Sequence, residues 1–268
     1  MVDAEPAWRA RLRLARRLAE SAPLTLGLWA CMDAETALAG GKDPDRRIQH
    51  KWVGRWASRV LELLDLDLAV DGRPYQLSER LPDRDADGHG RLFVMNHRSA
   101  IDIMVTFAVT EGSLVSRHDL AGWPVVGKGA QRLGTLFVDR SSMRSGAAVL
   151  KVMTRALEQG QGIAIYPEGT AFAGDEVRPF RPGAFRAAQR TGAPLVPMGI
   201  AYADESAYYG DESFAAHVER VMSKPGLRAA VEIGEPIHAR EGETLVSLRD
   251  RVHEAVQALV HRARARLS

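Results

Sequence analysis

Short apolar runs alternate with longer amphipathic segments over most of the chain after residue 64. The apolar runs have the length of strands and cover residues 66–70, 91–95, 113–116, 135–138, 162–166, 195–202 and 229–233. Helical length and spacing are found at residues 101–110, 123–133, 143–159, 182–190 and 244–267. Because strands and helices alternate, the pattern predicts an α/β fold with a mixed, mostly parallel central sheet flanked by helices.

Residues 1–64 are predicted to form an N-terminal helical appendage, leaving residues 65–268 as the main domain. A helical wheel of residues 7–20 places Trp8, Leu12, Ala15, Leu18 and Ala19 on one side, and Arg9, Arg13, Arg16 and Arg17 on the other. Pro23 and the pair Gly40-Gly41 are expected to break the region into two helical pieces and a turn, before a further helix near residues 46–64. Such a basic amphipathic helix either packs on its own domain or lies in a lipid headgroup layer, and by itself the segment favours the first.

Composition narrows the class of protein. The chain has 268 residues, of which 46% are hydrophobic and 26% charged, and these values describe an ordinary globular protein rather than a disordered one. The single cysteine, Cys31, offers neither an intramolecular disulfide nor a cysteine framework for structural zinc. The longest apolar stretch, residues 22–32, is far shorter than the roughly 20 residues that a membrane-spanning helix needs, so no such helix is expected. The start of the chain does not read as a secretory signal either.

Net charge gives no reason to expect a nucleic-acid partner. The formal charge is only +2 at pH 7, whereas residues 1–60 carry 11 Lys and Arg against 7 Asp and Glu. The N-terminal region is therefore the basic part of the chain.

A histidine and an aspartate stand directly after the strand predicted at residues 91–95, in the stretch Asn96-His97-Arg98-Ser99-Ala100-Ile101-Asp102. If Ser99 caps the following helix, Asp102 becomes its third residue, and His97 can fold back onto the carboxylate from the preceding loop. A plain variant of the capping box, with His97 in a structural role, fits the same residues. The other seven histidines lack metal-ligand spacing, so no metal site is expected.

Three further segments bear on the choice between a reactive and a purely structural role for His97 and Asp102. Residues 134–140 place Arg140 at the far end of an apolar strand, residues 166–170 end another strand with Glu-Gly-Thr, and residues 195–200 have a central proline. With these segments the sequence resembles the glycerolphosphate acyltransferase family, specifically its 1-acyl-sn-glycerol-3-phosphate (lysophosphatidate) acyltransferase type. The four family motifs match in order at Asn96, His97, Ser99 and Asp102; at Gly134, Phe137 and Arg140; at Pro167, Glu168, Gly169 and Thr170; and at Val196 and Pro197.

The resemblance implies an acyltransferase in which His97 is the general base and Asp102 orients it. The base removes a proton from the acceptor hydroxyl, and the alkoxide attacks acyl-CoA or acyl-carrier protein directly, without a covalent acyl-enzyme, a metal or a cofactor. Lysophosphatidate is the acceptor that the family type implies. The implied substrate-binding residues are Asn96, Ser99, Gly134, Phe137, Arg140, Glu168, Gly169, Thr170 and Pro197.

One position departs from the family pattern. An arginine commonly follows Glu-Gly-Thr and helps to bind the acceptor phosphate, but this chain has Ala171 there. Arg178 or Arg181 is a candidate for the missing guanidinium. Alternative acceptors therefore stay open: a lyso-aminolipid, another lysophospholipid or a glycolipid. A non-catalytic membrane-binding protein with the same fold is the alternative from another class.

The resemblance also changes the expectation for the appendage. A lysolipid acceptor has to be reached from a bilayer, so residues 7–32 are now expected to touch an anionic membrane surface. The protein is accordingly expected in the cytoplasm, peripheral on the inner face of the membrane.

Overall fold

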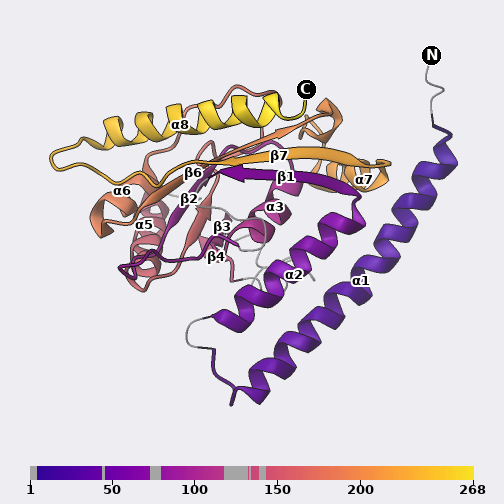
Figure 1. The fold of residues 1–268 in the computed structure, drawn as a ribbon, viewed down its shortest axis with the longest axis horizontal. Coiled ribbons are helices and arrows are strands. Elements are labelled where there is room, and N and C mark those ends of the chain that lie inside the picture. The colour runs from indigo at the N-terminus through magenta and orange to yellow at the C-terminus, as the bar shows by residue number, and fades with distance from the viewer. Residues whose placement is uncertain (1–4, 44–45, 73–79, 118–131, 133, 139–142) are drawn as a thin grey trace.

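A computed structural model describes residues 5–43, 46–72, 80–117, 132, 134–138 and 143–268 of the chain. Within these residues seven strands form one sheet in the order β1-β7-β6-β2-β5-β3-β4 (Figure 1). Their bounds are β1 Leu66–Gly72, β2 Leu92–Met95, β3 Ser113–Arg117, β4 Leu136–Val138, β5 Ile163–Ile165, β6 Leu195–Tyr202 and β7 Leu227–Ile233. Only β6 and β7 pair antiparallel, and all other neighbours are parallel. The predicted mixed, mostly parallel sheet is confirmed.

Helices cover both faces of this sheet. Their bounds are α1 Ala7–Leu38, α2 Arg47–Leu63, α3 Ile101–Val109, α5 Met143–Glu158, α6 Gly183–Thr191, α7 Phe214–Ser223 and α8 Leu245–Ala265, with a short 3₁₀ helix, η2, at Glu205–Ala207. Buried residues of α2, α3 and α7 pack in one hydrophobic cluster on one face, and those of α5, α6 and α8 pack in a second cluster on the other. The molecule therefore has three layers, helix, sheet and helix.

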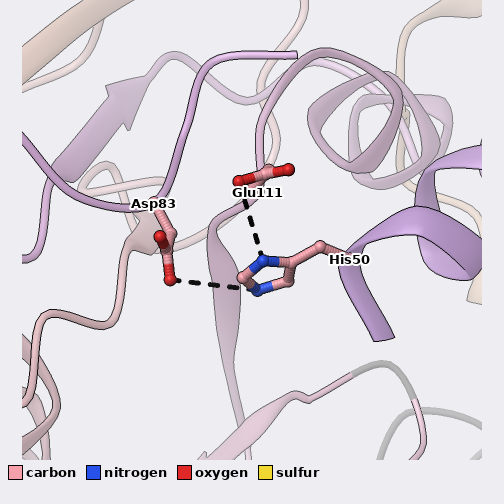
Figure 2. Close-up of side chains that lie close together, drawn as sticks. All are labelled: His50, Asp83 and Glu111. Carbon is pink, nitrogen blue, oxygen red and sulfur yellow. Dashed lines mark ion pairs between the residues drawn. The ribbon is translucent and has the colours of Figure 1, made fainter. Parts of the chain in front are cut away.

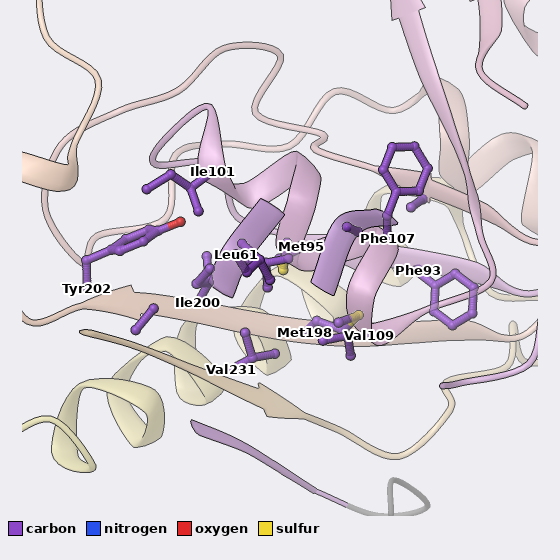
Figure 3. Close-up of a cluster of buried hydrophobic side chains, with 14 of the residues drawn as sticks. Leu61, Phe93, Met95, Ile101, Phe107, Val109, Met198, Ile200, Tyr202 and Val231 are labelled. Atoms are coloured by element: carbon purple, nitrogen blue, oxygen red, sulfur yellow. The ribbon is translucent and has the colours of Figure 1, made fainter. Parts of the chain in front are cut away.

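The central strands are apolar on both sides because both faces are covered. In β2, Phe93 and Met95 belong to the cluster with α2 and α3, while Leu92 and Val94 belong to the cluster with α8. Figure 3 shows the first of these clusters, with Phe93 and Met95 close to residues of α3 and β6. Strands buried on both faces are typical of parallel sheets, and they explain the continuous apolar runs in the sequence.

The N-terminal region differs from the prediction at Pro23. The structure has a single helix, α1, that continues through this proline, although proline removes one backbone hydrogen bond. Packing of α1 against α2 and α7 holds the helix together, and the hydroxyl of Ser21 donates to the carbonyl of Arg17 at 2.6 Å. The predicted turn is present, with Gly40 and Gly41 at φ +76° and +73°. Among the described residues, no helix is both long and apolar enough to cross a membrane.

Arg17, which the helical wheel places on the basic side of the first helix, faces the protein interior rather than solvent or lipid. Its guanidinium is fully buried and donates to the carbonyls of Met222 at 2.9 Å and Lys224 at 2.7 Å, and to Asp65 Oδ2 at 2.7 Å. The carbonyls at the end of α7 have no partners within their helix, so a cation is well placed there. Conversely, Trp8 and Leu12 on the apolar side of the wheel are exposed, with exposed fractions of 59% and 62%.

Two helices, α7 and α2, differ from what the sequence pattern predicts. Helix α7 was not predicted, and the helix expected at residues 123–133 falls almost entirely outside the described residues. Helix α2 shares the core of the sheet, because Val53, Ala57 and Leu61 belong to the first hydrophobic cluster. The division at residue 64 therefore remains a prediction, with α2 packed into the main core and α1 outside it.

Candidate active site at the carboxyl end of the sheet

The first and third sequence motifs meet at one edge of the sheet. His97 follows the end of β2, and Glu168 follows the end of β5, the parallel neighbour of β2. Carboxyl ends of parallel strands lie at the same edge, where α/β proteins usually bind ligands. The backbone N–H of His97 donates to Glu168 Oε1 at 2.7 Å, which joins the two motifs directly.

His97 and Asp102 are in direct contact. Nδ1 of His97 lies 2.7 Å from Oδ2 of Asp102. The helix begins at Ile101, as the helical pattern at residues 101–110 predicts, but Ala100 rather than Ser99 stands at its N-cap, without a side-chain capping bond. The reason is that Asp102 itself accepts the N–H groups of Arg98 at 2.6 Å and Ser99 at 2.9 Å. The two alternatives left open by the sequence thus occur together, since one carboxylate both satisfies the turn and contacts the imidazole.

Four donors fix the carboxylate of Asp102. The hydroxyl of Tyr202 adds a bond to Oδ1 at 2.6 Å, and the Asp102 side chain is fully buried. A buried carboxylate that accepts this many hydrogen bonds is held in one orientation. With Asp102 as an acceptor, Nδ1 of His97 carries the proton and Nε2 keeps its lone pair. Within the part of the chain that the structure describes, no residue is hydrogen-bonded to Nε2.

An aromatic ring supports the imidazole from one face. The rings of His97 and Tyr166 are stacked, with centroids 4.2 Å apart and planes at 15°. The Tyr166 hydroxyl is paired with Thr106 Oγ1 at 2.7 Å, and burial raises the pKa of Tyr166 well above its usual value. The tyrosine is therefore neutral and acts as a wall, while the His97 side chain keeps an exposed fraction of 20%.

Arg98, which the sequence analysis did not single out, joins the same network. Its guanidinium is buried and lies 3.0 Å from Glu168 Oε1 and 3.1 Å from Oε2. It also donates to the carbonyls of Gly174 at 2.5 Å and Glu176 at 2.9 Å. Glu168 is thus the counter-charge of a buried arginine as well as a support for the His97 backbone. In the sequence, the only sign of this role is the position of Arg98 inside the motif at residues 96–102.

A second buried histidine supports the loop from the other side. His217 of α7 accepts the N–H of Ala100 at Nε2, 3.1 Å away, and lies 3.1 Å from Ser99 Oγ. Its Nδ1 lies 3.0 Å from Glu212 Oε1, so Nδ1 carries the proton. Burial lowers the pKa of His217, which keeps the ring neutral. The sequence could not reveal this residue, because it stands more than 100 positions from the motif that it contacts.

Asn96 and Pro197 lie in the sheet rather than beside the imidazole. The Asn96 amide group exchanges two hydrogen bonds with the backbone of Ile200, at 2.9 and 2.8 Å. Pro197 is buried in β6, where its carbonyl accepts the N–H of Gly234 at 2.9 Å. Its missing N–H faces the side on which β7 has already ended, so proline is tolerated in a central strand. Thr170, the last residue of the third motif, is exposed.

The second motif is only partly described. Gly134 has φ +74°, and a Cβ there would overlap the guanidinium of Arg46 beside α2, so this glycine serves a close approach. The backbone of Phe137 lies in β4, but its side chain is outside the description, and Arg140 lies outside the described residues altogether.

One polar cluster at the opposite edge of the sheet has the residue types of a metal site (Figure 2). His50 Nε2 lies 4.0 Å from Asp83 Oδ2, and His50 Nδ1 lies 3.7 Å from Glu111 Oε2. The two carboxylates face different ring nitrogens, and arginines such as Arg46 and Arg80 lie close by. Burial, followed by these arginines, lowers the pKa of His50 to about 3, so a further divalent cation would be opposed by existing positive charge.

Comparisons with known proteins agree with the motifs. A family model described as Acyltransferase matches residues 75–201. A 1-acyl-sn-glycerol-3-phosphate acyltransferase of Neisseria meningitidis is 30% identical over 75% of this chain and 77% of its own. A lyso-ornithine lipid O-acyltransferase of Rhodobacter capsulatus is also 30% identical, over 87% and 84%. The fold is similar to that of the crystal structure of PlsC, the 1-acyl-sn-glycerophosphate (LPA) acyltransferase of Thermotoga maritima, with a TM-score of 0.65, 22% identity, and 94% and 99% of the two chains covered. The chain therefore belongs to the glycerolphosphate acyltransferase family that includes the 1-acyl-sn-glycerol-3-phosphate acyltransferases, and it is an acyltransferase.

Proposed function

We propose that the protein transfers a fatty acyl group from acyl-CoA or acyl-carrier protein to the free hydroxyl of lysophosphatidate. The observation that carries this proposal is the 2.7 Å contact between His97 Nδ1 and Asp102 Oδ2, in which the carboxylate is itself held by Tyr202 and two backbone amides. This arrangement leaves Nε2 of His97 as a base of fixed orientation.

The reaction then follows from the positions of the protons. Nε2 of His97 takes the proton of the acceptor hydroxyl, and the oxygen attacks the thioester carbonyl to give a tetrahedral oxyanion. Asp102 stabilises the imidazolium formed in this step. The oxyanion collapses, the carbon–sulfur bond breaks, and the imidazolium returns its proton to the leaving thiolate. The new ester and a free thiol are the products, and no side chain of the protein becomes acylated.

A second acceptor, a lyso-aminolipid, is supported by two observations. Ala171 stands where an arginine commonly follows Glu-Gly-Thr, which weakens the argument for a phosphate at that point. Relatives that include the Rhodobacter capsulatus protein are named lyso-ornithine lipid O-acyltransferases. The chemistry at His97 is the same for both acceptors, so the choice concerns only headgroup recognition.

A membrane-surface role for α1 is part of the same proposal. Its outward side carries Trp8, Leu12 and Leu18, with exposed fractions of 59%, 62% and 52%. Arginines on the same helix supply positive charge that favours anionic lipid. An enzyme whose acceptor resides in a bilayer gains from such a surface, and the inner face of the membrane is the location that we propose.

The decisive experiment measures thiol release from acyl-CoA with a panel of acceptors: lysophosphatidate, lyso-ornithine lipid, another lysophospholipid and a lysoglycolipid. We expect turnover that is fastest with lysophosphatidate. His97→Ala and Asp102→Asn should each reduce kcat by roughly 10²- to 10⁴-fold, because general-base catalysis is lost or its tautomer is wrong. Unchanged circular dichroism and melting temperature serve as controls for folding. Lipid binding without turnover on any acceptor would instead support the non-catalytic alternative.

A further inference from the structure

Two exposed arginines, Arg178 and Arg181, stand on the segment that follows the Glu-Gly-Thr turn. The backbone N–H of Arg178 donates to Glu168 Oε2 at 2.9 Å, and the N–H of Arg181 donates to the carbonyl of Pro167 at 2.9 Å. Both residues are therefore fixed, through their backbones, to the turn that also supports His97.

The side chains of Arg178 and Arg181 also lie against the Glu-Gly-Thr turn and the residues that follow it. A Cβ placed on Gly169 would lie only 2.5 Å from the Cζ and Nε atoms of Arg181, so the guanidinium occupies the space left by the missing side chain. Gly169 also has φ +87°, which favours glycine. The guanidinium of Arg178 lies 5.5 Å from the ring centroid of Phe172, whose N–H donates to the His97 carbonyl at 3.0 Å.

The charges of these two arginines are not used within the described part of the chain. Neither guanidinium has an ion pair or hydrogen bond to a described side chain. Two nearby acidic side chains are already engaged, because Glu168 pairs with Arg98, and Asp175 pairs with Arg264 at 2.6 Å. Two exposed cations beside the His97 loop, neither of them paired with a described carboxylate, form an anion-binding surface.

We infer that Arg178 and Arg181 form the subsite for the anionic headgroup of the acceptor, with Arg181 as its principal residue. This inference rests on the function proposed above and supplies the guanidinium that Ala171 does not. The phosphate of lysophosphatidate, like the carboxylate of a lyso-ornithine lipid, stands a few bonds from the reacting hydroxyl. The phosphates of CoA stand at the far end of the pantetheine arm. Anchorage beside the His97 loop therefore fits the acceptor anion rather than the donor.

Kinetics with an uncharged acceptor test the assignment. For Arg181→Gln we expect KM for lysophosphatidate to rise about tenfold to a hundredfold, the range for losing a hydrogen bond to a charged group, while KM for acyl-CoA stays unchanged. The preference for lysophosphatidate over the monoacylglycerol of equal chain length should collapse. Arg178→Gln should show a smaller effect in the same direction. Arg181→Lys, which keeps the charge but not the planar fork, should recover part of the loss.

The matched control is Arg186→Gln, because Arg186 is an exposed arginine on α6 and should leave all three values unchanged. A rise in KM for acyl-CoA alone, or no change in Arg181→Gln, would overturn the inference.

A binding measurement separates this inference from the proposed function. Titration calorimetry with a short-chain lysophosphatidate, kept below its micelle concentration, is carried out on the His97→Ala protein. Addition of Arg181→Gln should weaken binding about tenfold or more, and addition of Arg186→Gln should not. Binding that is lost with Arg181 supports the subsite even if the wild-type protein shows no turnover. Equal affinity in the two double variants refutes it even if turnover is normal.

Discussion

The hydroxyl of Tyr202 donates to Oδ1 of Asp102 at 2.6 Å, while His97 and two backbone amides use Oδ2. Tyr202 stands at the end of β6 and Asp102 in the first turn of α3, so one hydrogen bond ties the sheet to the helix whose carboxylate contacts His97. Burial, and then the charge of Asp102, raises the pKa of Tyr202 well above its ordinary value, so the hydroxyl keeps its proton at any pH of interest.

Tyr202→Phe removes this donor without changing the ring. We expect the free energy of unfolding to fall by about 1.5–3 kcal/mol, since a buried charged acceptor loses one partner, and kcat to fall as the carboxylate gains freedom. Urea unfolding and thiol release measure the two effects. Tyr209→Phe is the control, because no hydrogen bond of the Tyr209 hydroxyl is found within the described residues. A Tyr202→Phe protein as stable and active as wild type would contradict the role of this bond.

Glu168→Gln tests the buried ion pair with Arg98, whose partners are 1% and 0% exposed. The guanidinium would remain buried without a counter-charge, and such changes cost about 3–5 kcal/mol of unfolding free energy. Chemical denaturation gives the value. Glu62→Gln provides the comparison, because the Arg59–Glu62 pair is exposed and worth less than about 1 kcal/mol. If the two variants lost similar amounts of unfolding free energy, the buried pair would contribute no more to stability than the exposed pair does.

His217 is predicted to position the catalytic loop through its acceptor nitrogen. His217→Leu removes the partner of the Ala100 N–H, and kcat should fall while KM for both substrates changes little. His217→Gln offers an amide oxygen as a new acceptor and should restore part of kcat. Steady-state kinetics of the two variants at matched folding decide the point. If Leu and Gln at this position are equally active, the hydrogen bond is irrelevant to catalysis.

His50 should make the protein less stable in acid. Its pKa is 6.5 in the unfolded chain and about 3 in the folded protein, so between these values the unfolded state binds more protons. The free energy of unfolding then falls as pH falls, by up to about 1.4 kcal/mol per pH unit. Burial raises the pKa values of Asp83 and Glu111, whose contribution has the opposite sign at lower pH.

The variant His50→Gln isolates the histidine contribution. Between pH 7 and pH 5 we expect the wild type to lose up to about 2 kcal/mol more than the variant does. Urea unfolding at the two pH values measures the difference. Parallel pH dependence in the two proteins would mean that the imidazole is protonated equally in the folded and unfolded states.

The outward side of α1 predicts binding to anionic vesicles. Trp8→Ser combined with Leu12→Ser should reduce vesicle binding in a flotation assay, because apolar area no longer enters the interface. Val246→Ser is a matched change, since Val246 of α8 has a similar exposed fraction of 56%. High salt should weaken binding of the wild type as well. Equal flotation of the two variants would exclude this side of α1 as a membrane contact.

Local signals predicted the parts of the fold that local physics controls. Apolar runs predicted strands at residues 66–70 and 195–202, and the structure has them at 66–72 and 195–202. The β2–α3 motif was predicted because an apolar run ends at Met95, two residues before His97. The contact between His97 and Asp102 follows from five residues of separation and a helix start between them.

What the sequence could not reveal depends on tertiary contacts. Arg17 is buried because α7, some 200 residues later, ends beside it, and Pro23 stays inside a helix because neighbours hold both halves. Tyr202 and His217 reach the motif from segments about 100 residues away. Neither the spacing of residues along the sequence nor the periodicity of apolar positions predicts such long-range contacts.

Helix α7 has a neighbour at each end. Near its start, His217 accepts a hydrogen bond from the Ala100 N–H. At its end, the carbonyls of Met222 and Lys224 accept hydrogen bonds from Arg17 of α1. Through these contacts the ten residues of α7 link α1 to the loop that carries His97. A displacement of α1 relative to the sheet would therefore be transmitted through α7 to the Ala100 amide, three residues from His97.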